Sequence, residues 1–176
     1  MNARLFFALQ PPPELARRLH ARGAELLAPC AQDLRFYAAE ELHLTLVFLG
    51  ASPVPRLPRL ELEPLELELT GGGAFPDPVH PRAVWAGARE VPGAGGRLAE
   101  LAARLRAGLG LPAEEQPFRP HLTLARPRPG TQPRLPAGFA ALELPGTWLA
   151  REVRLFESRP DERPRYRVLA QLALEG

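Results

Sequence analysis

The stretches "ELHLTLVFLG", residues 41–50, and "PFRPHLTLAR", residues 117–126, share one tetrapeptide. His-Leu-Thr-Leu therefore occurs twice, 78 positions apart, in a chain that has only four histidines. In an extended strand, successive side chains alternate between the two faces of the sheet. Each copy then turns its leucines toward a core on one face. Its histidine and threonine stand side by side on the opposite face.

A pair of such strands facing one cleft would suit phosphoester chemistry. An imidazole titrates near neutral pH, so one histidine can act as a base while the other acts as an acid. A threonine hydroxyl can donate a hydrogen bond to a phosphate oxygen where negative charge develops. The candidate catalytic residues are therefore His43, His121, Thr45 and Thr123. This set of groups needs no metal ion.

The composition is that of an ordinary globular protein, with 45% hydrophobic and 24% charged residues. A length of 176 residues suits one domain, which we expect to span residues 1–176. No apolar run approaches the roughly 18 residues of a membrane span, so we expect no membrane association. The first 18 residues indicate a strand and a helix start and not a signal peptide. With a single cysteine, a cytoplasmic setting without disulfides is the expectation.

All 22 basic residues are arginines, although the net charge is only +2. The simplest explanation is a GC-rich genome that favours arginine codons. Arginine is nevertheless the side chain best suited to phosphate recognition, because its planar guanidinium can donate two parallel hydrogen bonds. The composition is thus compatible with an anionic substrate.

Strands and helices are expected to alternate along the chain. Amphipathic periodicity and helix end signals predict two helices, at residues 11–28 and 95–110. Strands are expected at residues 4–10, 42–50, 65–69, 82–88, 120–126, 139–144, 151–159 and 166–174. The "TGGG" at residues 70–73 is expected to end a strand, and the proline-rich residues 52–64 form a connector.

Each half of the chain supplies one long helix and one His-Leu-Thr-Leu strand. The order of elements predicts an α+β protein with a bilobal, pseudo-twofold architecture. Two antiparallel sheets are expected to line a central cleft, with the helices on the outside.

The two motifs and their flanks resemble the two-histidine (2H) phosphoesterase superfamily, over residues 4–174. The resemblance is to its RNA 2′,3′-cyclic phosphodiesterase (2′-5′ RNA ligase-like) family. The flanks are "RLFFAL", "GGGAFP" followed by "PRAVWAG", and "LFESR" followed by "YRVLAQLAL". The resemblance implies the bilobal fold and an RNA-processing hydrolase that uses no metal or other cofactor. The implied reaction converts RNA 2′,3′-cyclic phosphate ends to 2′-phosphomonoesters by two-histidine acid/base catalysis.

The resemblance also implies a role for each candidate residue. His43 matches the donor of a proton to the departing 3′ oxygen, and His121 matches the base that activates water. Thr45 and Thr123 match the donors to the phosphate oxygens.

Two substrate-binding residues follow from the same resemblance. Arg126, five places after His121, matches an arginine near the bound nucleotide. Phe7 sits at an aromatic position that can line the base pocket. The expected partners are RNA ends or nucleoside 2′,3′-cyclic phosphates. No obligate protein partner is evident, so a monomer is expected.

Several alternatives stay open on the sequence alone. The same site could join RNA ends as a 2′-5′ ligase, with a 5′-hydroxyl in place of water, or the chain could bind nucleotides without catalysis. If only one motif were present, the simplest interpretation would be that its histidine has a structural role. A zinc site would need at least three ligands. The remaining histidines do not suit one, since His20 falls in the first helix and His80 in a proline-rich loop.

Overall fold

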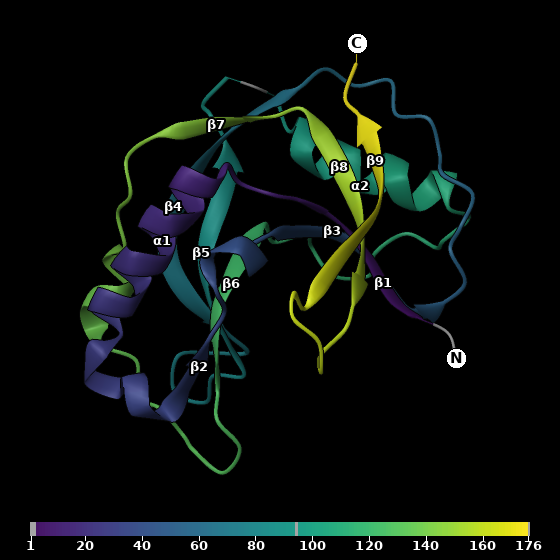
Figure 1. The fold of residues 1–176 in the computed structure, drawn as a ribbon. Coiled ribbons are helices and arrows are strands. Elements are labelled where there is room, and N and C mark those ends of the chain that lie inside the picture. Colours follow the sequence, from purple (N-terminus) through teal and green to yellow (C-terminus); the bar gives the residue numbers. More distant parts are fainter. Residues whose placement is uncertain (1–2, 94, 176) are drawn as a thin grey trace.

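An antiparallel sheet runs through the whole molecule, as the computed structural model in Figure 1 shows. The structure describes residues 3–93 and 95–175. Over these residues it contains two α-helices, α1 (Pro13–Leu26) and α2 (Arg97–Gly108), and three short 3₁₀ helices, η1 (Ala28–Asp33), η2 (Ala39–Glu41) and η3 (Ala137–Ala141). The same residues form nine strands: β1 (Ala3–Leu9), β2 (Leu34–Phe36), β3 (Leu44–Ser52), β4 (Leu65–Phe75), β5 (Ala83–Glu90), β6 (His121–Pro127), β7 (Thr147–Ala150), β8 (Glu152–Ser158) and β9 (Tyr166–Ala173).

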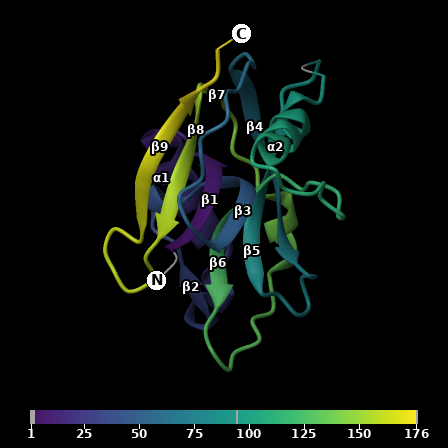
Figure 2. The same cartoon turned by 90° about the vertical axis from the view of Figure 1, so that its right-hand side faces the viewer.

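The strand order is β7-β4-β5-β6-β3-β1-β8-β9, with β2 paired to β6. All pairs of named strands are antiparallel, so the predicted α+β class is confirmed. The two predicted sheets are joined as halves of one sheet. Within the described residues, β3 and β6 pair at a single position, Leu44 with Leu122. Figure 2 shows the two halves side by side, with β9, β8, β1 and β3 next to β6 and β5.

The order is symmetric about the contact between β3 and β6, the two strands that carry the motifs. On either side of that contact β1 corresponds to β5, β8 to β4 and β9 to β7. Each helix crosses to the opposite half. Gly23 of α1 lies so close to Leu124 of β6 that an added Cβ would be 2.9 Å from that side chain. In the other half α2 contacts β3, where Leu46 and Ala102 line the same pocket.

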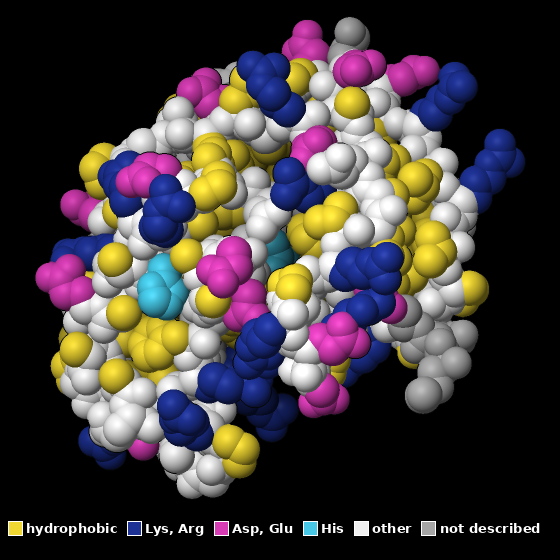
Figure 3. All heavy atoms as spheres, in the orientation of Figure 1, with side chains coloured by type: hydrophobic (Ala, Val, Ile, Leu, Met, Phe, Trp, Pro, Cys, Tyr) yellow, Lys and Arg dark blue, Asp and Glu magenta, His cyan; other side chains and the backbone are white. Residues whose placement is uncertain are grey.

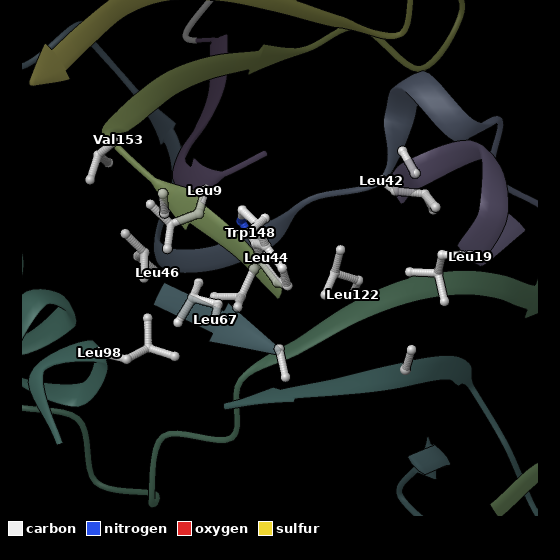
Figure 4. Close-up of a cluster of buried hydrophobic side chains, with 14 of the residues drawn as sticks. Leu9, Leu19, Leu42, Leu44, Leu46, Leu67, Leu98, Leu122, Trp148 and Val153 are labelled. Atoms are coloured by element: carbon white, nitrogen blue, oxygen red, sulfur yellow. The ribbon is translucent and has the colours of Figure 1, made fainter. Parts of the chain in front are cut away.

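The tetrapeptide leucines lie in the main core, as predicted. Leu44 and Leu122 are fully buried, and Leu46 and Leu124 are nearly so. Figure 4 shows Leu44, Leu46 and Leu122 within one cluster. Burying a leucine stabilises a fold by about 1.5–3 kcal/mol. These four side chains therefore fix which face of the sheet carries the histidines and threonines.

The expected strand break at residues 70–73 was wrong. Strand β4 continues through the three glycines to Phe75, and η3 passes directly over it. A Cβ on Gly71 would lie 2.3 Å from the Ala140 carbonyl oxygen, and one on Gly72 would lie 2.3 Å from that of Phe139. The glycines thus provide room for a close backbone approach, which is a known use of glycine inside a strand.

Residues 139–144 were predicted to be a strand and are not one, because η3 occupies residues 137–141. Phe139 is 2% exposed and anchors this 3₁₀ turn in the core. The short strands β2 and β7 were not expected. The other predicted strands and both helices are confirmed within a few residues, and residues 53–60 are irregular, as expected of the connector. No helix in residues 3–93 and 95–175 is long and apolar enough to cross a membrane.

Replacing Gly72 with alanine should destabilise the fold. The new methyl group would lie 2.3 Å from the Phe139 carbonyl oxygen and 2.6 Å from a ring carbon of Phe139. Relief requires a shift of the η3 backbone, so we expect a loss of about 2 kcal/mol in the free energy of unfolding. Urea denaturation measures it. Gly138→Ala is the matched control in η3 itself, because a Cβ there meets nothing within 4 Å. Equal stabilities of the two variants would contradict this account.

Candidate active site

The four predicted catalytic side chains line one cleft of about 620 Å³. His43 immediately precedes β3 and Thr45 is its second residue, whereas His121 and Thr123 lie at the start of β6. The antiparallel pair of Leu44 and Leu122 sets His43 across from Thr123, and Thr45 across from His121. The structure therefore brings together two imidazoles and two hydroxyls around a local twofold axis.

Both histidines are held by the same hydrogen bond. The Nδ1 atom of His43 lies 2.7 Å from the carbonyl oxygen of Glu41, and that of His121 lies 2.7 Å from the carbonyl oxygen of Arg119. A carbonyl oxygen can only accept, so each Nδ1 carries a proton and donates it. Nε2 is then the atom that gains or loses a proton in both rings.

Aromatic rings surround His43. Its ring centroid lies 4.7 Å from that of Phe6 and 5.0 Å from that of Tyr166. Burial among these groups lowers the pKa of His43 to about 4. The hydrogen bond to Glu41 opposes this shift, while the nearby His121 adds to it. With no anion bound, His43 is therefore neutral at neutral pH.

His121 occupies an equivalent but more open position. Its ring centroid lies 4.8 Å from that of Phe75 and 6.0 Å from that of Trp85. Burial lowers its pKa, the hydrogen bond to the Arg119 carbonyl opposes that shift, and the positive charge of Arg126 adds to it. A bound anion would raise both histidine pKa values, because it favours the imidazolium form.

Arginines supply the charge of the cleft: Arg4, Arg35, Arg126 and Arg165 line its wall. Among the described residues that line the cleft there is no aspartate or glutamate. Figure 3 shows one face of the molecule with a recessed histidine near its middle, acidic side chains beside it and arginine side chains gathered below. Glu41 lies behind the wall, where its carboxylate is 3.7 Å from Arg165. The cleft thus presents a positive potential to a ligand.

The family model described as LigT like Phosphoesterase matches residues 9–85 and again residues 90–166. Each match contains one of the two His-Leu-Thr-Leu motifs. This chain belongs to the LigT-like phosphoesterase family. The family lies within the 2H superfamily, in agreement with the resemblance of the sequence.

Relatives of this LigT-like chain extend over nearly its whole length. An RNA 2′,3′-cyclic phosphodiesterase of Thermus thermophilus is 36% identical over 194 aligned residues, which cover 98% of this chain and 91% of the relative. A solved structure of a Thermus thermophilus protein, TT0787, is similar with a TM-score of 0.72 and 30% identity, covering 98% of both chains. Escherichia coli LigT complexed with 3′-AMP has a TM-score of 0.70 and 27% identity, covering all of both chains.

One predicted substrate contact of this LigT-like protein is wrong. Phe7 is fully buried in the main core and cannot touch a ligand in the cleft. Its neighbour Phe6 lines the cleft and stacks near His43. The two rings alternate across β1, so one of them had to face the core.

The other predicted contact, Arg126, lies in the cleft wall. Its guanidinium donates to the Tyr37 hydroxyl at 3.1 Å and to the Arg82 carbonyl at 3.3 Å. These bonds hold the side chain beside His121. Its contact with a substrate stays a prediction.

Sequence reasoning missed much of the cleft wall of this LigT-like fold: Arg4, Phe6, Arg35, Tyr37, Phe48, Ser158, Pro160, Arg165 and Tyr166. Most come from β1, β2 and the β8–β9 region, outside the two motifs. Tyr166 keeps its proton, because burial and the neighbouring Tyr37 raise its pKa. Among these residues, only Phe6 could have been found from the sequence. It is adjacent to Phe7 in a strand, so one ring of the pair must face away from the main core.

The other two histidines lie outside the cleft. His20 is on α1, near the ring of Phe36, and His80 lies 3.7 Å from the Asp77 carboxylate in the turn before β5. Over residues 3–93 and 95–175, no group of three or more His, Cys, Asp and Glu side chains could hold a metal ion.

Proposed function

We propose that this chain is an RNA 2′,3′-cyclic phosphodiesterase that forms 2′-phosphomonoesters by two-histidine acid/base catalysis without a metal. The observation that most supports this proposal is a pair of equivalent imidazoles in one arginine-lined cleft. Each imidazole has its Nδ1 hydrogen-bonded to a backbone carbonyl oxygen. Relatives named RNA 2′,3′-cyclic phosphodiesterase support the substrate class.

The proposed step is an in-line displacement at phosphorus. Nε2 of neutral His121 takes a proton from water as the water oxygen forms a bond to phosphorus. The bond from phosphorus to the 3′ oxygen breaks, and Nε2 of protonated His43 gives its proton to that oxygen. The product carries a 2′-phosphate and a 3′-hydroxyl. Proton exchange with solvent then restores both histidines.

The remaining groups of the cleft would stabilise the phosphate. Thr45 and Thr123 stand opposite the two histidines and can donate to the non-bridging oxygens. The cleft arginines add positive charge near the negative charge that develops in the transition state. We carry two further expectations forward with this function: the whole chain acts as one monomeric domain, and it works in the cytoplasm.

The test is hydrolysis of an oligoribonucleotide that ends in a 2′,3′-cyclic phosphate, in the presence of excess EDTA. We expect full activity and a 2′-phosphate as the sole product, because the proposed acid and base are both protein groups. Loss of activity in EDTA with recovery on adding a divalent ion would refute the metal-free mechanism. A second reaction that contains RNA with a 5′-hydroxyl end tests the ligase alternative, for which a joined product would be diagnostic.

A further inference from the structure

The two motif strands carry the same β-bulge. Leu46 on β3 and Leu124 on β6 are each an extra residue that the register with the neighbouring strand skips. A bulge changes the direction in which the following side chains point. The fifth residue after each motif histidine therefore turns back into the cleft, as Phe48 on β3 and Arg126 on β6.

The two ends of the cleft consequently differ in chemistry, although its centre is symmetric. The first end, which we call the aromatic arm, consists of Phe48 and Arg4, whose guanidinium carbon lies 5.9 Å from the Phe48 ring centroid. The second end, the basic arm, consists of Arg126, Tyr37 and Arg35. The symmetric pair of histidines cannot select one orientation of a bound substrate. The aromatic arm and the basic arm can, because they differ in chemistry.

Phe48 is exposed where a ring of its size would ordinarily be buried. Its exposed fraction is 54%, and it is the one aromatic residue among the large exposed hydrophobic side chains of residues 3–93 and 95–175. Without the bulge, Val47 would face the cleft and Phe48 the core; in the structure Val47 is buried. The fold thus turns an aromatic ring toward solvent inside a basic cleft.

Charge on this arm is available to a phosphate. Within the described residues, Arg4, the basic group of the aromatic arm, forms no ion pair with a carboxylate. Exposed rings that stack on bases, beside basic groups that follow the backbone, are the means by which proteins hold single-stranded nucleic acid. An arginine over the ring can also contribute a cation–π contact to the stack.

We propose that the aromatic arm binds the base of the nucleotide that precedes the cyclic-phosphate nucleotide. Thr45 pairs with Ala8 and Phe48 with Phe6, so the two side chains lie two strand positions apart, roughly 7 Å along the sheet. The ring therefore lies past the groups that touch the reacting phosphate, where the RNA chain would continue. This inference rests on the proposed function and makes RNA ends of two or more nucleotides the preferred substrate over a single cyclic nucleotide.

The experiment compares a dinucleotide that ends in a 2′,3′-cyclic phosphate with a nucleoside 2′,3′-cyclic phosphate. Phe48→Ala should lower kcat/KM for the dinucleotide about tenfold, through KM, because one stacked base is lost. The same variant should change kcat/KM for the nucleoside substrate less than about twofold, which also shows that it folds. Phe48→Trp retains a stacking surface and should behave as the wild type on both substrates.

Leu149→Ala is the matched control, because Leu149 is an exposed apolar residue on β7 outside the cleft. This variant should leave kcat/KM unchanged for both substrates. An equal loss on both substrates in Phe48→Ala, or no loss on the dinucleotide, overturns the inference. Dissociation constants for a 3′-phosphorylated dinucleotide and for a 3′-mononucleotide should show the same dependence on Phe48. That measurement needs no turnover, so it tests the arm even if the protein hydrolyses neither substrate.

Discussion

His43→Ala should slow hydrolysis of an RNA 2′,3′-cyclic phosphate by at least about 100-fold, and His121→Ala should cost a similar factor. Each substitution removes one of the two groups proposed to transfer a proton at Nε2, and no other histidine lines the cleft among the described residues. Single-turnover rates at saturating substrate measure the loss directly. His80→Ala is the control, because that side chain lies in an exposed turn away from the cleft. A loss of less than about threefold in either cleft variant would refute the acid/base proposal.

The division of roles between the two rings requires a second substrate. A cyclic phosphate with a sulfur leaving group in place of the 3′ oxygen needs little protonation as it departs. That substrate should restore the rate of His43→Ala, which lacks the proposed acid, and should not restore His121→Ala, which lacks the proposed base. Rescue of His121→Ala alone would reverse the roles.

The pH dependence should differ between kcat/KM and kcat. The alkaline limb of kcat/KM reports the free enzyme, in which burial lowers the pKa of His43 to about 4 and also lowers that of His121. Both groups are then largely deprotonated above about pH 6.5, the ordinary histidine value. As pH rises further, the protonated acid disappears. We therefore expect kcat/KM at about pH 8 to be at least about tenfold below its maximum.

The limb of kcat should lie at higher pH, because it reports the enzyme–substrate complex. The bound phosphate anion favours the imidazolium form and raises the pKa of the acid, so protonation persists to higher pH. We expect the two limbs to differ by about one pH unit or more, measured in a constant-ionic-strength buffer series. Coincident limbs, or a kcat/KM limb above about pH 7, would show that burial does not depress these histidines.

The grouping of the four candidate side chains in one cleft could be predicted from the sequence, because it depends on strand alternation. Once Leu44 and Leu122 are taken as core, the faces of His43 and His121 follow. Both helices and most strands were likewise predicted, from periodicity together with the residues that mark their ends. The single-domain assignment and the twofold duplication stay predictions.

The cleft wall could not be predicted, because it depends on local departures from regular alternation. Phe6 and Phe7 are equally plausible from the sequence, and only the pairing of β1 with β3 decides that Phe6 faces the cleft. Two bulges reverse the side of Phe48 and Arg126. The glycines of β4 look like a turn in the sequence. Only the structure shows that they make room for the backbone of η3, which packs directly over them.

The crossed helices have a consequence for how this protein could be divided. Helix α1 belongs to the first family match but covers Leu124 of the second, and α2 belongs to the second match but contacts β3 of the first. A half made separately would lack the helix that packs against Leu46 or Leu124 of its own motif strand. Strands cross as well, because β4 of the first match lies on the β6 side of the sheet and β8 of the second match pairs with β1. The candidate active site therefore lies where two halves meet that depend on each other for their cores. The same pairwise symmetry relates the two histidines and the two crossed helices.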